Sequence, residues 1–206
     1  MKREFSDIQV HDIKRKAGYD GFFKIGIYSF SHELFNGGQS PIVTREVFER
    51  GTAAAVLPYD PNTDEVLLIQ QFLIGAQLSG TPNRPLQVIA GMVEKGEAGM
   101  DVARREAEEE AGITLKGRIT PALAFLPSPG GSSERIETFV AEADLSNAGG
   151  VFGLAEENED IRAQVFSAEE AIRMLDSGEI QAGPAVVVLS WFARYRAELQ
   201  ARWAKE

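Results

Sequence analysis

Three glutamates in one short stretch of the chain have the type and spacing of a metal-binding cluster. Glu106, Glu109 and Glu110 lie within residues 91–113, which read GMVEKGEAGMDVARREAEEEAGI. Residues three and four apart project from the same face of an α-helix, so a helix here would gather the three carboxylates. Neighbouring carboxylates repel one another, and hard divalent cations relieve that repulsion because they bind clustered carboxylate oxygens. The stretch therefore predicts a site for a divalent cation.

A helix over residues 101–111 is expected from the composition of this range and from its end signals. Most of its residues are strong helix formers, and Asp101 is a suitable N-cap. Gly112 stands where a helix commonly stops. Three glycines before the helix would allow the backbone to loop closely around a bound ligand. They are Gly91, Gly96 and Gly99.

A solvent-exposed helix is the alternative interpretation of the same acidic run. In that case Arg104 and Arg105 would pair with Glu108 and Glu109, each four residues further along the helix. The preceding glycines, together with the offsets of Glu97 and Arg105 from the acidic cluster, favour the metal site instead.

The complete spacing of this stretch resembles the sequence signature of the Nudix hydrolases. It runs as Gly91, five residues, Glu97, seven residues, Arg105-Glu106, two residues, Glu109-Glu110, one residue, Gly112 and Ile113. The resemblance implies an α/β fold, namely the Nudix α/β/α sandwich with a mixed sheet. It also implies hydrolysis of a nucleoside diphosphate linked to another group, in which water attacks a phosphorus of the pyrophosphate.

The same resemblance implies roles for individual residues around divalent ions, Mg²⁺ with Mn²⁺ as the alternative. The implied metal ligands are the backbone carbonyl of Ala90 and the carboxylates of Glu106, Glu110 and Glu159. Glu157 is the expected general base, and Glu109 is a further catalytic candidate and an alternative ligand. Glu97 and Arg105 are expected to form an ion pair that shapes the loop and the helix.

Three further stretches are similar to the ADP-ribose pyrophosphatase subfamily. Residues 126–135 (LPSPGGSSER) place a proline in a Ser-Pro-Gly setting, and residues 153–161 (GLAEENEDI) resemble an acidic catalytic loop. Residues 21–23 (GFF) and 45–50 (REVFER) resemble the strands through which these enzymes form domain-swapped homodimers. The resemblance covers nearly the whole chain and implies that ADP-ribose is cleaved to AMP and ribose 5-phosphate.

The subfamily resemblance also implies which residues contact the substrate. The diphosphate and terminal ribose would be lined by Met92, Ser128, Pro129 and Gly130. Glu134 would contact a sugar hydroxyl, and Arg50 would lie near the ligand. A partner subunit would supply the residues that stack on and hydrogen-bond the adenine, which are Phe22, Phe23, Arg45 and Glu46. Taken singly, each stretch also fits a turn, a solvated loop or packed core, so it is their joint order that favours the site.

Two positions depart from the subfamily pattern. Leu73 stands where these enzymes commonly carry an arginine, and Gln87 stands three residues before Ala90, where glutamate is common. Segment 75–85 is also atypical, and Arg84 within it is a candidate for the missing cation. A GDP-hexose or another nucleotide sugar is therefore the alternative substrate. A third hypothesis is a sensor that binds nucleotide sugars without cleaving them. Such sensors usually lose the glutamates of the signature and carry a DNA-binding segment, whereas this chain keeps the glutamates and has no basic helix.

The hydrophobic pattern predicts the elements that must position these groups. Residues 1–50 are expected to form a small N-terminal antiparallel β-domain that dimerises, and residues 51–206 the Nudix domain. Ser167 begins a capping box for a helix that runs to residue 175, and residues 184–203 have the apolar stripe of a long final helix. Strands are expected at residues 22–28, 42–48, 53–57, 65–70, 86–90, 119–125 and 136–141.

Composition limits the classes of function. The chain has 206 residues and a formal net charge of −10, so it lacks the basic footprint that non-specific nucleic-acid binding requires. It has no cysteine, which excludes disulfides, thiolate nucleophiles and Cys-type zinc sites. The amino terminus lacks the apolar core of a signal peptide, and no run approaches a membrane span. We therefore expect a cytoplasmic protein that partners a nucleotide-sugar substrate and a second copy of itself, with no nucleic-acid or membrane partner.

Overall fold

The computed structural model describes residues 8–115 and 117–205, apart from the side chain of Glu157. The chain forms two compact units. One comprises the segment up to Gly51 together with the loop Leu126–Glu134, and the other comprises Thr52–Phe125 and Arg135–Glu206. The loop that carries the Ser-Pro-Gly sequence therefore belongs to the N-terminal unit. The expected division into two domains at residue 50 stays a prediction.

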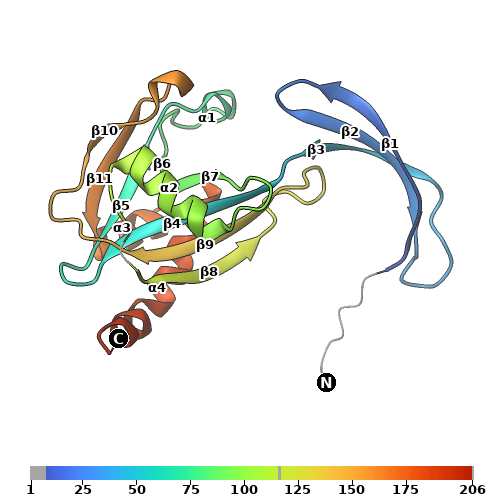
Figure 1. Ribbon diagram of the computed structural model, residues 1–206. Helices are drawn as coiled ribbons and strands as arrows, with labels where there is room; N and C mark the ends of the chain where they lie inside the picture. Colours follow the sequence, from blue (N-terminus) through green and yellow to red (C-terminus); the bar gives the residue numbers. More distant parts are fainter. Residues whose placement is uncertain (1–7, 116, 206) are drawn as a thin grey trace. The chain divides into compact units, whose positions relative to one another are not determined.

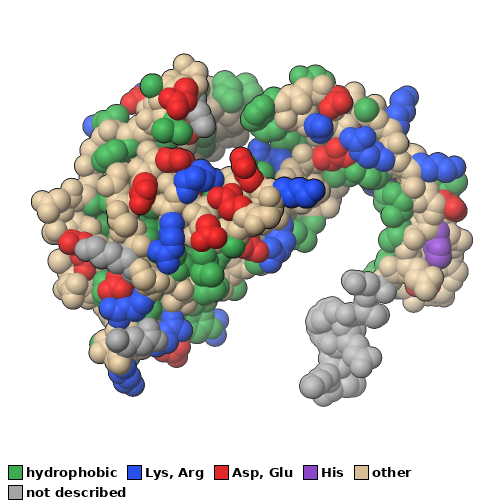
Figure 2. Space-filling model, in the orientation of Figure 1, with side chains coloured by type: hydrophobic (Ala, Val, Ile, Leu, Met, Phe, Trp, Pro, Cys, Tyr) green, Lys and Arg blue, Asp and Glu red, His purple; other side chains and the backbone are tan. Residues whose placement is uncertain are grey.

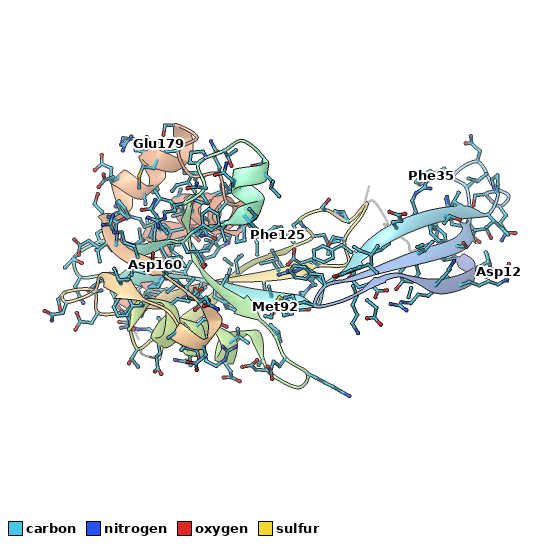
Figure 3. All side chains as sticks on the ribbon, turned by 90° about the horizontal axis from the view of Figure 1, so that it is seen from above. Asp12, Phe35, Met92, Phe125, Asp160 and Glu179 are labelled. Atoms are coloured by element: carbon cyan, nitrogen blue, oxygen red, sulfur yellow. The ribbon has the colours of Figure 1, made fainter. Side chains whose placement is uncertain are left out.

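A three-stranded antiparallel sheet forms most of the N-terminal unit (Figure 1). Its strands are, in order across the sheet, β1 (Val10–Asp20), β2 (Lys24–His32) and β3 (Val43–Glu49). Gly37 and Gly38 form the turn between β2 and β3, both at φ +82°, a conformation that favours glycine. Phe35 in the same turn is 103% exposed, and its side chain points away from the sheet (Figure 3).

The loop Leu126–Glu134 is attached to β3 by backbone hydrogen bonds. The N–H of Phe48 donates to the carbonyl of Gly131 at 2.8 Å, and the N–H of Ser133 donates to the carbonyl of Phe48 at 3.0 Å. These bonds continue the edge of the sheet with a segment far away in the sequence. They bring the end of β3 beside residues that the sequence assigned to the substrate site.

The larger unit is built on a mixed sheet with β4 (Thr52–Asp60) at its centre. β4 runs parallel to β9 (Arg135–Glu142) and antiparallel to β5 (Glu65–Gln70) and β7 (Ile89–Met92). β8 lies beyond β9, β11 and then β10 lie beyond β5, and β6 pairs with β5. The bounds of these four strands are Ile119–Phe125 (β8), Ile161–Ser167 (β11), Gly150–Phe152 (β10) and Leu86–Gln87 (β6).

Helices cover both faces of this sheet (Figure 1). The three longest are α2 (Gly99–Ala111), α3 (Ala168–Asp176) and α4 (Gly183–Trp203). Ala54 and Val56 of β4 face the core under α2, whereas Ala55 and Leu57 face the core under α3 and α4, because successive side chains of a strand point to opposite faces. The expected α/β/α sandwich with a mixed sheet and a separate N-terminal sheet is confirmed.

Several elements differ from the sequence-based expectation. α2 begins at Gly99 with Ala98 as its N-cap, so the prediction of Asp101 as the N-cap is wrong; Asp101 lies in the first turn, where its charge favours the helix dipole. The strand expected over residues 86–90 is two strands, because the chain leaves β5 after Gln87 and joins β4 at Ile89. The sequence pattern does not predict β1, β10, β11 or the short helix α1 (Ile74–Leu78). In the described ranges, no helix combines the length and apolar character needed to cross a membrane.

Candidate active site

Two glycines fix how α2 lies against its neighbours. Gly112 ends the helix in the left-handed conformation at φ +62°, and a Cβ there would lie 2.4 Å from the ring of Phe152. Gly91 of β7 faces Glu106 so closely that an added Cβ would lie 1.7 Å from a carboxylate oxygen. The carboxylate of Glu106 is therefore seated against the backbone of β7. The expected looping of the glycines around a bound ligand stays a prediction.

Glu110 is a buried carboxylate one helical turn further along. It is 4% exposed, and one of its oxygens accepts the backbone N–H of Ala90 at 3.1 Å. Burial, opposed by this hydrogen bond and reinforced by the charges of Glu106 and Glu159, raises the pKa of the Glu110 carboxyl to about 8. An ionised carboxylate in such a place is costly unless a positive charge accompanies it. The position of Glu110 therefore favours the binding of a cation.

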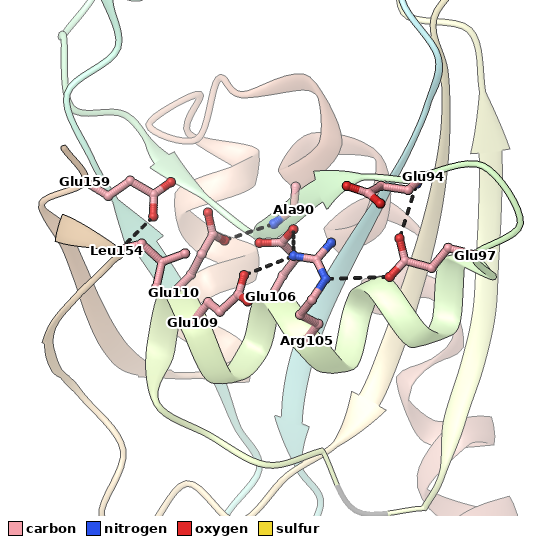
Figure 4. Close-up of polar contacts among 9 residues, drawn as sticks. All are labelled: Ala90, Glu94, Glu97, Arg105, Glu106, Glu109, Glu110, Leu154 and Glu159. Carbon is pink, nitrogen blue, oxygen red and sulfur yellow. Dashed lines mark hydrogen bonds and ion pairs between the residues drawn. The ribbon is translucent and has the colours of Figure 1, made fainter. Parts of the chain in front are cut away.

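Arg105 lies among carboxylates of the helix and of the loop that precedes it (Figure 4). Its Nη1 donates to Glu106 at 2.7 Å and to Glu109 at 3.0 Å, and its Nε lies 3.6 Å from Glu97. Glu106 and Glu109 thus share one guanidinium, which agrees with the prediction that they project from one face. The expected ion pair between Glu97 and Arg105 is confirmed, although it is the longest of these three contacts.

If α2 were simply a solvent-exposed helix, Arg104 and Arg105 would each pair with a glutamate four residues further along. Only one of these two expected ion pairs is present among the residues that the structure describes. Arg105 pairs with Glu109 at the expected spacing, but Arg104 donates to the carbonyls of Leu115 and Gly117 at 2.7 and 3.3 Å. Acidic side chains gather on the face of the larger unit that carries α2, with basic side chains between them (Figure 2). The contact between Arg105 and its neighbour Glu106 could not be found from helix spacing, since adjacent residues do not normally face each other.

The acidic loop between β10 and β11 approaches the same carboxylates. Glu159 accepts the backbone N–H of Leu154 at 3.2 Å, and its charge contributes to the raised pKa of both Glu106 and Glu110, for which burial is the main cause. The short 3₁₀ helix Ala155–Glu157 precedes it. The side chain of Glu157 lies outside the described part of the structure, so its role as general base stays a prediction.

The donor set of this site fits a hard divalent cation. Every candidate ligand supplies an oxygen atom. Glu110 is buried, whereas Ala90, whose N–H donates a hydrogen bond to Glu110, is exposed to solvent. Among the described residues, no three acidic or histidine side chains are already arranged to hold one ion. Two of the carboxylates, those of Glu106 and Glu109, bind the Arg105 guanidinium instead.

The predicted substrate residues of the N-terminal unit form an aromatic and arginine cluster within that unit. The rings of Phe22 and Phe23 lie 4.9 Å apart, and Phe23 contacts Phe48 at 5.1 Å. Arg50 lies over Phe23 and Phe48, with 5.4 and 5.6 Å to the ring centres, and its Nε donates to Glu134 at 2.9 Å. Phe22 is 95% exposed, so its face is open to a ligand. Phe48 was not among the predicted residues, although its place in the REVFER stretch was a signal for it.

The remaining predicted contacts are exposed side chains and a tight turn. The carbonyl of Ser128 accepts the N–H groups of Gly131 and Ser132, which leaves Pro129 and Gly130 exposed at the tip. Two exposed side chains come from β3 and one from the end of β7; they are Arg45, Glu46 and Met92.

The departures from the subfamily pattern lie in the larger unit. Leu73 is the N-cap residue of α1. Gln87 has a buried side-chain nitrogen with no hydrogen-bond partner among the described residues. Arg84 lies 3.7 Å from Asp160, next to Glu159 in the acidic loop, and its carbonyl accepts a hydrogen bond from Gln70 at 2.9 Å. Arg84 is thus held beside the acidic loop.

Comparisons with known proteins agree with this geometry. A family profile described as the NUDIX domain matches residues 49–186. The ADP-ribose pyrophosphatase of Escherichia coli (strain K12) is 47% identical over 200 residues, which cover 97% of this chain and 95% of that protein. A GDP-mannose pyrophosphatase of Enterobacter sp. (strain 638) is 32% identical over 188 residues, covering 89% of this chain and 95% of that protein. A crystal structure of an ADP compounds hydrolase has a similar fold, with a TM-score of 0.65, 17% identity, and coverage of 93% of this chain and 97% of that one.

Proposed function

Because the chain belongs to the Nudix family and is a pyrophosphohydrolase, we propose that it acts on ADP-ribose and releases AMP and ribose 5-phosphate. Nudix hydrolases generally use divalent metal ions. The observation that carries the proposal is the group of carboxylates on α2, in which Glu110 is buried and Glu106 is seated against β7. The close similarity to ADP-ribose pyrophosphatases supports the choice of substrate.

The proposed reaction is attack of water on one phosphorus of the diphosphate. The carbonyl of Ala90 and the carboxylates of Glu106, Glu110 and Glu159 would hold the divalent ions, with Glu109 as a further ligand or catalytic group. A bound divalent cation supplies positive charge that offsets the diphosphate and acidifies water. Glu157 would accept the proton of the attacking water as the new phosphorus–oxygen bond forms. The bond between that phosphorus and the bridging oxygen breaks, and the bridging oxygen leaves with the other phosphate.

We also propose how the substrate is held. Phe22 and Phe23 of a second copy would stack on the adenine, and that copy would contribute Arg45 and Glu46 as hydrogen-bonding groups. Aromatic faces favour stacking with a base, and the exposure of Phe22 leaves such a face open. Glu134 would contact a sugar hydroxyl, and Arg50, whose Nε donates to Glu134, would lie near the ligand. The turn around the Ser-Pro-Gly sequence and Met92 would line the diphosphate and terminal ribose; these turn residues are Ser128, Pro129 and Gly130.

The assay that tests the substrate uses the purified protein, Mg²⁺ and a panel of nucleotide sugars. Turnover of ADP-ribose in preference to GDP-mannose supports the proposal, and equal amounts of AMP and ribose 5-phosphate show that cleavage is at the pyrophosphate linkage. Turnover of no member of the panel, with either Mg²⁺ or Mn²⁺, contradicts it. Repeating the assay with each ion alone distinguishes the Mg²⁺ assignment from the Mn²⁺ alternative.

A GDP-hexose is the second candidate substrate. It is favoured by the similarity to GDP-mannose pyrophosphatases and by Leu73, whose side chain cannot bind a phosphate. A higher kcat/KM for GDP-mannose than for ADP-ribose in the same panel would establish it. The assignment as an enzyme leaves the sensor hypothesis without support, and the cytoplasmic location stays a prediction.

A further inference from the structure

Arg105 contacts two separate groups of carboxylates. Its Nη1 bridges Glu106 and Glu109 at 2.7 and 3.0 Å, on the face of α2 assigned to the divalent cation. Its Nε lies 3.6 Å from Glu97, in the loop before the helix. Figure 4 shows the guanidinium between the two groups. The single positive charge of Arg105 is thus positioned to form ion pairs with either group.

The two groups of carboxylates differ in their hydrogen bonds and in their exposure to solvent. One oxygen of Glu97 accepts the backbone N–H of Glu94 at 3.2 Å, and the other oxygen is the one near Arg105. Glu97 is therefore already oriented to receive the guanidinium more closely. Glu106 and Glu109 have side chains only 13% and 29% exposed, so neutralising their charge matters more than it would on an open surface.

A divalent cation and a guanidinium cannot occupy the same carboxylates without repelling each other. We propose that Arg105 is a resident cation of the metal-free site, which releases Glu106 and Glu109 when a divalent ion binds and then pairs more closely with Glu97. The inference rests on the proposed function, because it takes the carboxylates of α2 as the metal site. It makes Arg105 a positioning residue that sets how tightly the ion binds, in addition to shaping the loop.

Two substitutions should change cation affinity in opposite directions. Arg105→Gln removes the competing charge, so Mn²⁺ or Mg²⁺ should bind about three- to tenfold more tightly than to the wild type. Glu97→Gln keeps an oxygen for the N–H of Glu94 but removes the charged acceptor for Arg105. The guanidinium then stays on Glu106 and Glu109, and cation binding should weaken by a similar factor.

Each variant has a matched control on α2. Arg104→Gln removes the same charge from a side chain that binds only the carbonyls of Leu115 and Gly117 among the contacts described. Glu108→Gln removes a negative charge from an exposed side chain. The dissociation constants are measured by calorimetry with Mn²⁺ alone, at one fixed pH for all variants and without substrate. Circular dichroism checks that each variant is folded.

A second readout is made on the wild type, with Arg105→Gln used only to assign the signal. In the wild type, the Nε–H NMR signal of Arg105 should shift as Mg²⁺ is added, and it should be assigned by its disappearance in Arg105→Gln. A signal that does not respond while Mg²⁺ binds overturns the proposal.

The outcomes separate this inference from the proposed function. Opposite shifts in Arg105→Gln and Glu97→Gln, larger than those of their controls, support the release of Glu106 and Glu109 by Arg105. Weaker binding in Arg105→Gln, or shifts equal to the controls, overturn it while leaving the metal site intact. A wild type that binds neither Mg²⁺ nor Mn²⁺ overturns the metal assignment of the proposed function and this inference with it.

Discussion

The three carboxylates on α2 differ in their surroundings: Glu110 is buried and accepts the backbone N–H of Ala90, whereas Glu106 and Glu109 bind the Arg105 guanidinium. The spacing of Glu106, Glu109 and Glu110 was sufficient to predict that they share a helix face. It could not predict that Glu110 is buried against Ala90, because that depends on how α2 packs on β7. Nor could it predict that Arg105 bridges two of the glutamates. At this scale the sequence identifies candidate site residues, and packing decides their charge and their partners.

Replacing either metal-ligand candidate should abolish most of the activity without unfolding the protein. Glu106→Gln and Glu110→Gln keep the size of the side chain but remove the charge that holds the cation. Stabilisation by a metal ion amounts to several kcal/mol, so kcat should fall about 10³-fold. Steady-state assays with Mg²⁺ measure the effect, and Glu108→Gln on the same helix is the control. Activity near that of the wild type in both variants would remove these residues from the metal site.

The raised pKa of Glu110 predicts how the stability of the metal-free protein depends on pH. The folded state holds a proton on Glu110 up to about pH 8, whereas the unfolded chain loses it near the ordinary value of 4.5. Between these values the folded state binds more protons, so this group lowers the free energy of unfolding as pH rises, by roughly a few kcal/mol in total. Glu110→Gln should remove this contribution of Glu110 to the pH dependence of the free energy of unfolding.

Denaturant titrations in EDTA, at several pH values between the two limits, measure this difference between the wild type and Glu110→Gln. The variant should be the more stable protein at the upper end of the range and nearly equal at the lower end. Parallel curves for the two proteins would show that Glu110 is ionised in the metal-free fold.

Secondary-structure elements were predictable where their sequence pattern is long and regular. The capping box at Ser167 and the stripe of the final helix gave α3 and α4 within a residue or two, and the side chain of Ser167 does accept the N–H of Glu170. β10 and β11 lack such a pattern, because β10 has three residues and β11 alternates only partly. The split between β6 and β7 depends on a change of partner strand, which a local pattern does not contain.

The close approach of β7 and α2 gives a prediction for Gly91. An alanine there places its Cβ 1.7 Å from the Glu106 carboxylate, which lies at the end of a flexible side chain and would move away. Gly91→Ala should therefore lower kcat by about 10²-fold, the scale expected for a misplaced catalytic group, while the protein stays folded. Gly75→Ala in α1 is the control, because nothing lies within 4 Å of its added Cβ. Equal activity in the two variants would show that the position of Glu106 is unimportant.

At the scale of the whole molecule, the two groups of predicted site residues belong to different units of the chain. The metal-ligand candidates are in the larger unit, and the adenine-contact candidates Phe22 and Phe23 are in the N-terminal unit. That unit exposes many large apolar side chains, a feature typical of interaction surfaces. They are Ile8, Val10, Ile13, Tyr19, Phe22, Phe23, Leu34, Phe35, Ile42 and Leu126. These observations support the proposal of a homodimer, which light scattering on the purified protein would measure directly.

Mixing two inactive variants tests whether a partner subunit completes the site. Glu106→Gln disables the metal site, and the double variant Phe22→Ala, Phe23→Ala disables the adenine contact, so each homodimer should have low activity. In a hybrid dimer with exchanged N-terminal units, one site receives both defects and the other receives neither. Random pairing then restores about a quarter of the sites, because half of the dimers are hybrids and each has one intact site.

A hybrid of Glu106→Gln with Glu110→Gln is the control and should stay inactive, since both defects lie in the larger unit. If co-expressed, differently tagged hybrids of the first pair are as inactive as their parents, then Phe22 and Phe23 do not act across the dimer.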